Sequence, residues 1–398
     1  MSLGNDLFVF SPSASYPRPF AAVIDDRARI VHAWSSPIGQ PDVETSPPSY
    51  LRGWNHIEVT PDGCLFAIVP LHALLKLAPD STLVWRADVP AHHDLALGPH
   101  GEVYVLTEEP RPVPCAGGSH VLLDNSITVL GPDGELREAH SLYEILTTDP
   151  YLAALITDAI GRHRQAGRTA DTAVLASRLE GANGWLRGRD VSRLLRSRPG
   201  SPSDILHTNT LEILPAHPAG LWAAGDVLVS MRDLDLIAVL DLGARTVRWW
   251  WGPGELSGQH QPSAQPDGTI LVFDNGRRAG RSRILEIEPV TRAVVWQCEP
   301  GLFCEMAGGC ERLADGTFLI SDAQAGRALI IDRDGRERWQ VQVSTSTSGA
   351  RSRAEFYRFS AIPGSAARHL GTGDRPARTL AESRVRCQLG HQSIRSAL

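Results

Sequence analysis

The segment QPDGTILVFD at residues 265–274 places a tight turn, Asp267-Gly268, directly before a run of mostly apolar, β-forming residues. The same order of turn and strand recurs in TPDGCLFAIV from Thr60, GPHGEVYVL from Gly98 and LADGTFLISD from Leu313. A turn that ends in glycine suits a hairpin, because glycine adopts the left-handed backbone at little cost. The pattern therefore predicts a chain built from repeated hairpins.

A second hairpin that ends in tryptophan follows several of these units. The tryptophans in question are Trp34, Trp85, Trp249, Trp296 and Trp339. The last three are spaced roughly 45 residues apart, which is enough chain for two hairpins, or one four-stranded blade. Two hairpins per repeat predict an all-β fold, a β-propeller. We interpret the tryptophans as packing residues between blades.

Counting these units predicts a six-bladed β-propeller over residues 1–363. The units are residues 6–36, 55–87, 92–140, 207–251, 260–298 and 305–343. A further strand, EFYRFSAIP from Glu355, is predicted to complete the first blade and close the ring. Closure of this kind removes an exposed sheet edge.

Two stretches do not follow the repeat. Residues 141–200 carry apolar residues at helical spacing and predict a helical insertion between blades three and four. This insertion could form a cap over one face or a helical pair on the outer rim. Residues 364–398 have few large apolar residues, and we expect a loosely ordered C-terminal tail.

Composition excludes several classes of function. The chain has 398 residues, of which 42% are hydrophobic, so it can bury a sizeable core. A net charge of −6 argues against a nucleic-acid partner, and no apolar run is long enough for a membrane span. The six cysteines form no CxxC pair, and the first residues lack a basic and then apolar leader. We therefore expect a reduced, cytoplasmic protein.

Polar segments, most of them with histidine, stand at the start of successive blades. First strands line the channel of a propeller, so these residues should gather at one channel mouth. They are His56, His92, His93, Asp94, His207, Asn209 and His260, with Cys310 at this place in the sixth blade. A single histidine is most often structural, but packing gives no reason for one residue type to recur at this place. Crowded imidazoles also lower one another's pKa, which keeps at least one of them neutral near pH 7.

Arg232 follows a strand of the fourth blade that should return to the same mouth. A guanidinium group is a planar fork that suits a tetrahedral oxyanion such as sulfate or phosphate. The alternative is a salt bridge to Asp233 or Asp235. In the fifth blade, residues 274–276 read Asp-Asn-Gly and predict a turn of architectural rather than chemical importance.

At these residues the chain resembles the bacterial arylsulfotransferase-like family of six-bladed propellers. The segments that carry the resemblance are HHDLAL at 92–97, LHTNTLEIL at 206–214, VLVSMRDLDLIAVLD at 227–241, GQH at 258–260, FDNG at 273–276, SRILEIE at 282–288 and GGCERLADGTFLISDAQAGRALIID at 308–332. Together the matching segments span most of the repeat region.

The resemblance implies transfer of a sulfuryl group from an aryl sulfate to a phenol through a sulfated histidine, with no nucleotide donor and no cofactor. It implies that His260 of the QH motif is the nucleophile, and that His207 and Arg232 hold the sulfuryl oxygens. His93 completes the implied catalytic set. From their place at the mouth we expect His56, His92, Asn209 and Cys310 to bind the substrate, and the implied partner is a small aromatic molecule.

Two other hypotheses remain open from the residues themselves. In the first, a transition metal is bound by His56, His93, His207 and His260, with Cys310 or Asp94 as a further ligand, in a lyase or oxidoreductase. In the second, the propeller is not catalytic and binds a partner on its face.

Overall fold

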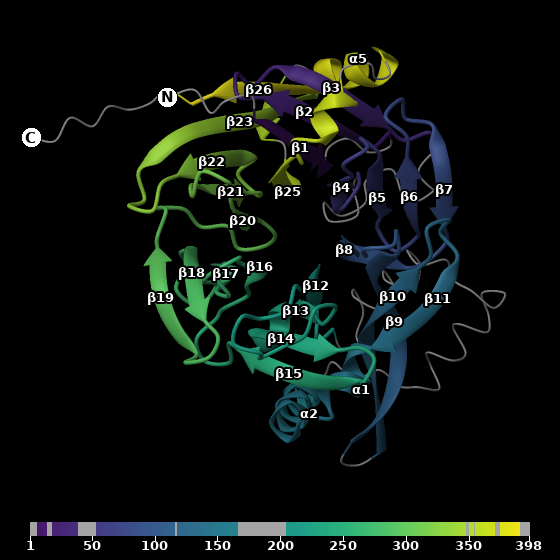
Figure 1. Cartoon of the computed structure of the whole chain (residues 1–398), viewed down its shortest axis with the longest axis vertical. Coiled ribbons are helices and arrows are strands. Elements are labelled where there is room, and N and C mark those ends of the chain that lie inside the picture. The colour runs from purple at the N-terminus through teal and green to yellow at the C-terminus, as the bar shows by residue number, and fades with distance from the viewer. Residues whose placement is uncertain are drawn as a thin grey trace, which may run out of the picture.

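The structure is a computed structural model that describes residues 6–13, 18–38, 53–115, 118–165, 204–347, 350–353, 355–370 and 375–390. In these residues six antiparallel sheets are arranged in a ring around a common centre (Figure 1). The chain is a six-bladed β-propeller, as the hairpin repeat predicts.

Each blade is built on four antiparallel strands, which are named below in order from the innermost to the outermost. The first consists of β25 (Phe356–Ala361), β1 (Leu7–Pro12), β2 (Phe20–Asp25) and β3 (Ile30–Ser35). The second consists of β4 (Ile57–Val59), β5 (Leu65–Val69), β6 (Ala73–Leu77) and β7 (Leu83–Ala87), and the third of β8 (Ala91–Leu97), β9 (Val103–Cys115), β10 (Gly118–Leu130) and β11 (Leu136–Ser141). The fourth consists of β12 (Thr208–Ile213), β13 (Val227–Met231), β14 (Leu236–Asp241) and β15 (Thr246–Trp251). The fifth consists of β16 (His260–Ala264), β17 (Ile270–Asp274), β18 (Arg283–Glu288) and β19 (Ala293–Cys298), and the sixth of β20 (Gly309–Arg312), β21 (Phe318–Asp322), β22 (Arg327–Ile331) and β23 (Glu337–Thr347), extended by β24 (Ala350–Arg353).

The ring is closed by a strand from the C-terminal part of the chain. β25 pairs with β1, with Phe8 opposite Ala361 and Phe10 opposite Phe359. The prediction that the strand after Glu355 completes the first blade is therefore confirmed. Closure places residues from opposite ends of the chain in one sheet.

Four of the five predicted tryptophans form a hydrogen bond to the neighbouring blade. Their indole N–H groups donate to main-chain carbonyls of turns in the next blade: Trp85 to Pro132 (2.8 Å), Trp249 to Pro289 (3.0 Å), Trp296 to Arg333 (3.2 Å) and Trp339 to Asp26 (2.8 Å). Each contact repeats the same geometry one blade further around the ring. The tryptophans thus set the spacing of the blades that surround the channel.

Two helices follow the third blade, within the predicted insertion. α1 (Leu142–Leu146) begins at Ser141, whose hydroxyl accepts from the main-chain N–H of Glu144, and α2 (Pro150–Gln165) follows it. Their apolar residues pack with those of blades three and four, and α2 contacts the 3₁₀ helix η3 (Arg232–Leu234). The rest of the predicted helical segment, residues 166–203, lies outside the described residues.

The C-terminal segment has more order than we expected. After the short helix η4 (Ala366–Arg368), α5 (Arg375–Arg384) leads into β26 (Val385–Leu389), which pairs with β23. The expectation of a loose tail is wrong for these residues. Ala377, Ala381 and Val385 are buried against the core, because small side chains one helical turn apart allow close packing. None of the helices in the described ranges has the length and apolar character needed to cross a membrane.

Candidate functional site

The inner strands of blades three, four and five each carry an irregularity at the predicted site residues. In β8, Ala91 pairs with Thr107 and Leu95 with Val105, so residues 92–94 bulge out of the ladder. In β12 and β16, one extra residue interrupts the pairing after Thr208 and after His260. A bulge redirects side chains and is frequent beside active sites.

Strained backbone conformations occur at the same three places. His93, His207 and Gln261 have φ values of 53°, 46° and 47°, in the left-handed region that residues with a side chain seldom adopt. Such conformations are costly and persist only where the surroundings enforce them. The bulges and the left-handed residues together turn side chains from three blades towards one channel mouth.

Four of the predicted histidines lie close together, and two of them, His93 and His260, lie beside one tyrosine. The ring centroids of His93 and His207 are 4.8 Å apart. His92 and His93 are hydrogen-bonded to each other through their Nδ1 atoms, which are 2.7 Å apart. Tyr357 of β25 lies with its ring centroid 5.7 Å from His93 and 6.4 Å from His260. The structure therefore brings His92, His93, His207 and His260 into one cluster.

His260 is fully enclosed, and both of its nitrogens are engaged. Nδ1 lies 2.7 Å from the side-chain oxygen of Asn275 and 3.1 Å from the carbonyl oxygen of Gly258. Nε2 accepts from the main-chain N–H of Ala307 at 3.2 Å. Burial, reinforced by the positive charge of Arg232, lowers the pKa of His260 to about 3. The imidazole is therefore neutral at physiological pH.

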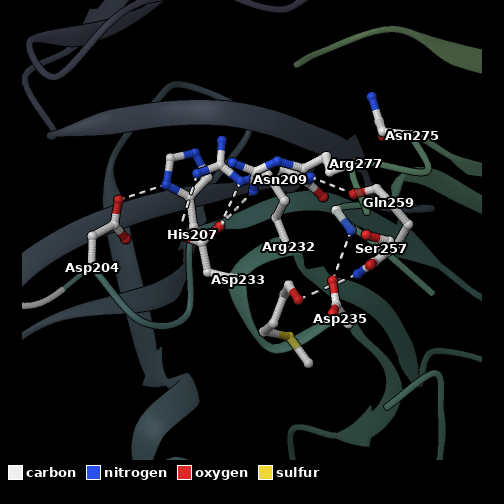
Figure 2. A network of polar contacts seen from close by, with 12 residues as sticks. Asp204, His207, Asn209, Arg232, Asp233, Asp235, Ser257, Gln259, Asn275 and Arg277 are labelled. Atoms are coloured by element: carbon white, nitrogen blue, oxygen red, sulfur yellow. Dashed lines mark hydrogen bonds and ion pairs between the residues drawn. The ribbon is translucent and has the colours of Figure 1, made fainter. Parts of the chain in front are cut away.

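His207 has a different kind of partner. Its Nδ1 lies 2.5 Å from a carboxylate oxygen of Asp204, a contact drawn in Figure 2. Burial lowers the pKa of His207, the charge of Arg232 lowers it further, and Asp204 opposes both effects. A carboxylate in this position orients the ring and stabilises the imidazolium when a proton is taken up.

Arg232 lies beside both imidazoles at the start of η3. Its main-chain N–H donates to the carbonyl of His207 at 3.3 Å, which fixes the turn against the fourth inner strand. The guanidinium donates to both carboxylate oxygens of Asp233, from Nε at 2.8 Å and Nη2 at 3.3 Å (Figure 2). The salt bridge foreseen as an alternative is present, yet the charge also acts on the site by lowering the pKa values of His207 and His260.

Asn209 supports the site without facing it. Its side-chain amide donates to the carbonyl of Gln259 at 2.8 Å and is fully buried. Gln259 in turn donates to Ser230 at 3.1 Å and to the carbonyl of Leu236 at 3.0 Å. Asn209 therefore holds the segment before His260 between two blades, and its assignment as a substrate-binding residue stays a prediction.

His56 belongs to a buried ionic network around Asp94. Its Nε2 lies 3.2 Å from Asp94, whose carboxylate also accepts from Arg358 at 3.2 Å and from the main-chain N–H of Leu211 at 3.1 Å. These four residues come from four different blades. The network ties the closing strand to the ring, so Asp94 and His56 are engaged in structure rather than directed at a ligand.

Cys310 lies in the hydrophobic core, not at the mouth. β20 pairs with β21 without a bulge, so regular alternation directs Cys310 into the sheet packing, where it is 1% exposed. Burial raises the pKa of its thiol well above the ordinary value. Beside it, Gly309 makes room for Gln261, because a Cβ there would lie 1.7 Å from the amide oxygen. The prediction that Cys310 binds substrate is not supported by this placement.

The histidines do not form a common ligand set for a metal. Across the parts of the chain that the structure describes, no group of three or more His, Cys, Asp or Glu side chains is arranged to hold a metal ion. The Nε2 of His56 faces the Asp94 carboxylate, and that of His260 faces a main-chain N–H. The geometry does not favour one metal centre built from these four imidazoles.

Two residues of the cluster escaped the sequence analysis. Tyr357 donates from its hydroxyl to the carbonyl of Asn209 at 3.0 Å, and burial raises its pKa. Asp204 lies three residues before His207 and pairs with it. The signal for Tyr357 was present in the predicted closing strand, because an innermost strand must place polar residues at the channel.

The fold and the cluster define the chain as a six-bladed propeller with histidines and arginine at one channel mouth. Residues 192–344, which include His207, Arg232 and His260, match the family model described as Arylsulfotransferase (ASST). Over these residues the chain is similar to that family. No curated protein matches it.

Several solved structures are similar to this chain. A protein of unknown function from Bacteroides caccae is 12% identical with a TM-score of 0.49, with 90% of this chain and 99% of that one covered. Apo AztD from Citrobacter koseri is 9% identical with a TM-score of 0.41, covering 90% and 98%. An inactive virginiamycin B lyase from Staphylococcus aureus with quinupristin is 9% identical with a TM-score of 0.37, covering 89% and 86%.

Proposed function

We propose that this chain transfers a sulfuryl group from an aryl sulfate to a phenol, with His260 as the residue that carries the group. The observation that supports this most directly is the buried, neutral imidazole of His260 beside Arg232 and His207. All three residues lie within the stretch that matches the arylsulfotransferase family model. Only an unprotonated ring nitrogen can attack sulfur, and a low pKa keeps it unprotonated.

In the first half of the cycle, Nε2 of His260 attacks the sulfur of the aryl sulfate. The N–S bond forms as the bond between sulfur and the aryl oxygen breaks. The electron pair leaves with the phenolate, which takes up a proton from solvent water. Sulfuryl transfer resembles phosphoryl transfer in its loose transition state, with charge on the peripheral oxygens. Arg232 would stabilise that charge as a fixed donor. The contact between Ala307 and Nε2 must open for the attack.

In the second half, a phenolic acceptor attacks the sulfur. The O–S bond forms while the N–S bond breaks and returns its electron pair to Nε2. The acceptor's proton must go to a base, and His207 is suited to take it because Asp204 stabilises the resulting imidazolium. Nothing is oxidised or reduced, and the cycle needs no cofactor. The substrates are small aromatic molecules.

The test is the covalent intermediate itself. After incubation with 4-nitrophenyl sulfate and digestion without acid, we expect a mass gain of about 80 Da, one SO₃ group, on the peptide that contains His260. His260→Ala should abolish the adduct, whereas His100→Ala, an exposed histidine on a turn, should retain it. Elemental analysis of untagged protein completes the test. A stoichiometric transition metal without any adduct would refute sulfuryl transfer in favour of the metal hypothesis.

A further inference from the structure

The two central histidines face different kinds of acceptor at Nδ1. His207 faces the carboxylate of Asp204, whereas His260 faces the side-chain amide of Asn275. The difference is chemical, because a carboxylate can accept a proton and stabilise a cation, while an amide oxygen only accepts a hydrogen bond. The partner at Nδ1 therefore influences which protonation state of each ring is stable.

The orientation of the Asn275 amide is set by its surroundings. Its Nδ2 lies 2.7 Å from the carbonyl oxygen of Cys304 and 2.9 Å from that of Ala307. Both are acceptors only, so the NH₂ group must face them and Oδ1 must face His260. Asn275 is completely buried, and Ser282 donates to its carbonyl at 3.0 Å, which holds the turn in place.

The tautomer of His260 follows from these contacts. Nδ1 faces two oxygens that can only accept, from Asn275 and Gly258, so Nδ1 carries the proton. Nε2 faces the main-chain N–H of Ala307, which can only donate, so Nε2 presents its lone pair. The tautomer of His260 is therefore determined by main-chain groups and by one side-chain amide whose orientation main-chain carbonyls fix.

We propose that Asn275 is a positioning residue for His260: its amide keeps the ring proton on Nδ1 and leaves Nε2 as the only nitrogen that can attack. Its role in transfer rests on the proposed function, but the tautomer does not. Asn275 also bears on the second half of the cycle. With SO₃ on Nε2 and a proton on Nδ1, the ring is cationic and a good leaving group. A carboxylate partner could take the Nδ1 proton and leave a neutral, less reactive adduct.

The tautomer can be measured directly. In protein labelled with ¹⁵N-histidine, with the His260 signals assigned by their loss in His260→Ala, we expect a protonated Nδ1 and an unprotonated Nε2 between pH 5 and 8. A wild-type spectrum with the proton on Nε2, or a ring that titrates near pH 6.5, overturns the proposal. This measurement needs no substrate and no variant at Asn275.

The matched variants are Asn275→Asp and Asn125→Asp, two changes at fully buried asparagines whose oxygens each accept a hydrogen bond. We expect Asn275→Asp to raise the pKa of His260 and to lower turnover near pH 7 by about tenfold or more, with partial recovery at higher pH. The Asn125→Asp protein should keep the wild-type pH profile. Equal profiles for both variants, each shown to be folded, would overturn the positioning role.

Failure of the two proposals can be told apart. If His260 has the assigned tautomer but no sulfated intermediate forms, sulfuryl transfer is wrong and the tautomer assignment stands. If the intermediate forms while Nε2 carries the proton in the resting protein, the role of Asn275 is wrong and sulfuryl transfer stands.

Discussion

Replacing Asp94 with asparagine should destabilise the folded ring far more than a change at an ordinary surface aspartate. The Asp94 side chain is 2% exposed, and its partner Arg358 is 9% exposed. The carboxylate accepts from Arg358 and from the main-chain N–H groups of Leu211 and Leu95, and it lies 3.2 Å from Nε2 of His56. Asparagine keeps the volume but removes the charge, so the buried guanidinium loses the carboxylate that it contacts.

The expected cost is about 3–5 kcal/mol of unfolding free energy, the usual penalty for breaking a buried ion pair at one partner. A second change, Arg358→Met, should recover part of this loss, because it removes the buried charge that Asp94→Asn leaves unpaired. The double variant should therefore be more stable than Asp94→Asn alone. A higher unfolding free energy in the double variant would show that the loss in Asp94→Asn is electrostatic, because a loss of packing would not be recovered by a second substitution.

Equilibrium unfolding in urea, followed by tryptophan fluorescence, measures these differences. The matched control is Asp334→Asn, which breaks an Asp–Arg pair in which both side chains are about two-thirds exposed and should cost under about 1 kcal/mol. The reasoning is refuted if both single variants lose the same small amount. It is also refuted if Arg358→Met adds to the loss caused by Asp94→Asn.

Two further predictions concern the site and the channel. Arg232→Ala should slow turnover of an aryl sulfate by about 10²–10³-fold in steady-state assays. Arg248→Ala, on the outer strand of the same blade, should leave turnover nearly unchanged. Equal rates for the two variants would contradict the role of Arg232 as an oxyanion donor. Burial raises the pKa of Glu212 to about 7 from an ordinary 4.5, so the folded state keeps a proton that the unfolded chain releases. Its contribution to stability is therefore full below pH 4.5 and lost as the pH rises through 7, and urea midpoints at pH 5 and 8 should differ less in Glu212→Gln than in the wild type.

The blades could be predicted from the sequence because their signals are local. Turn residues such as Asp267-Gly268 and the alternation that follows need only neighbours along the chain to determine a hairpin. The recurring tryptophans follow the same period, and their contacts with the next blade are a direct result of that repetition. The expected closing strand is of the same kind, since an incomplete first blade requires a partner.

The site depended on features that no local pattern reveals. A shift of one residue moves a side chain to the opposite face of a strand. The third, fourth and fifth inner strands carry bulges at or beside His93, His207 and His260, whereas the regular sixth strand directs Cys310 into the core. The tail was misjudged for a related reason, because alanines can pack closely only where a partner surface exists.

The sequence alone predicted the six blades and the recurrence of histidine where inner strands begin. Only the tertiary structure decided the chemistry of each ring, because a histidine's partner is set by which atoms meet across blades. Tyr357 reached the cluster through closure of the ring, 97 positions beyond His260 in the numbering. Asn275 and Asp204 gave His260 and His207 different partners, and that difference exists only once the blades are packed around the channel.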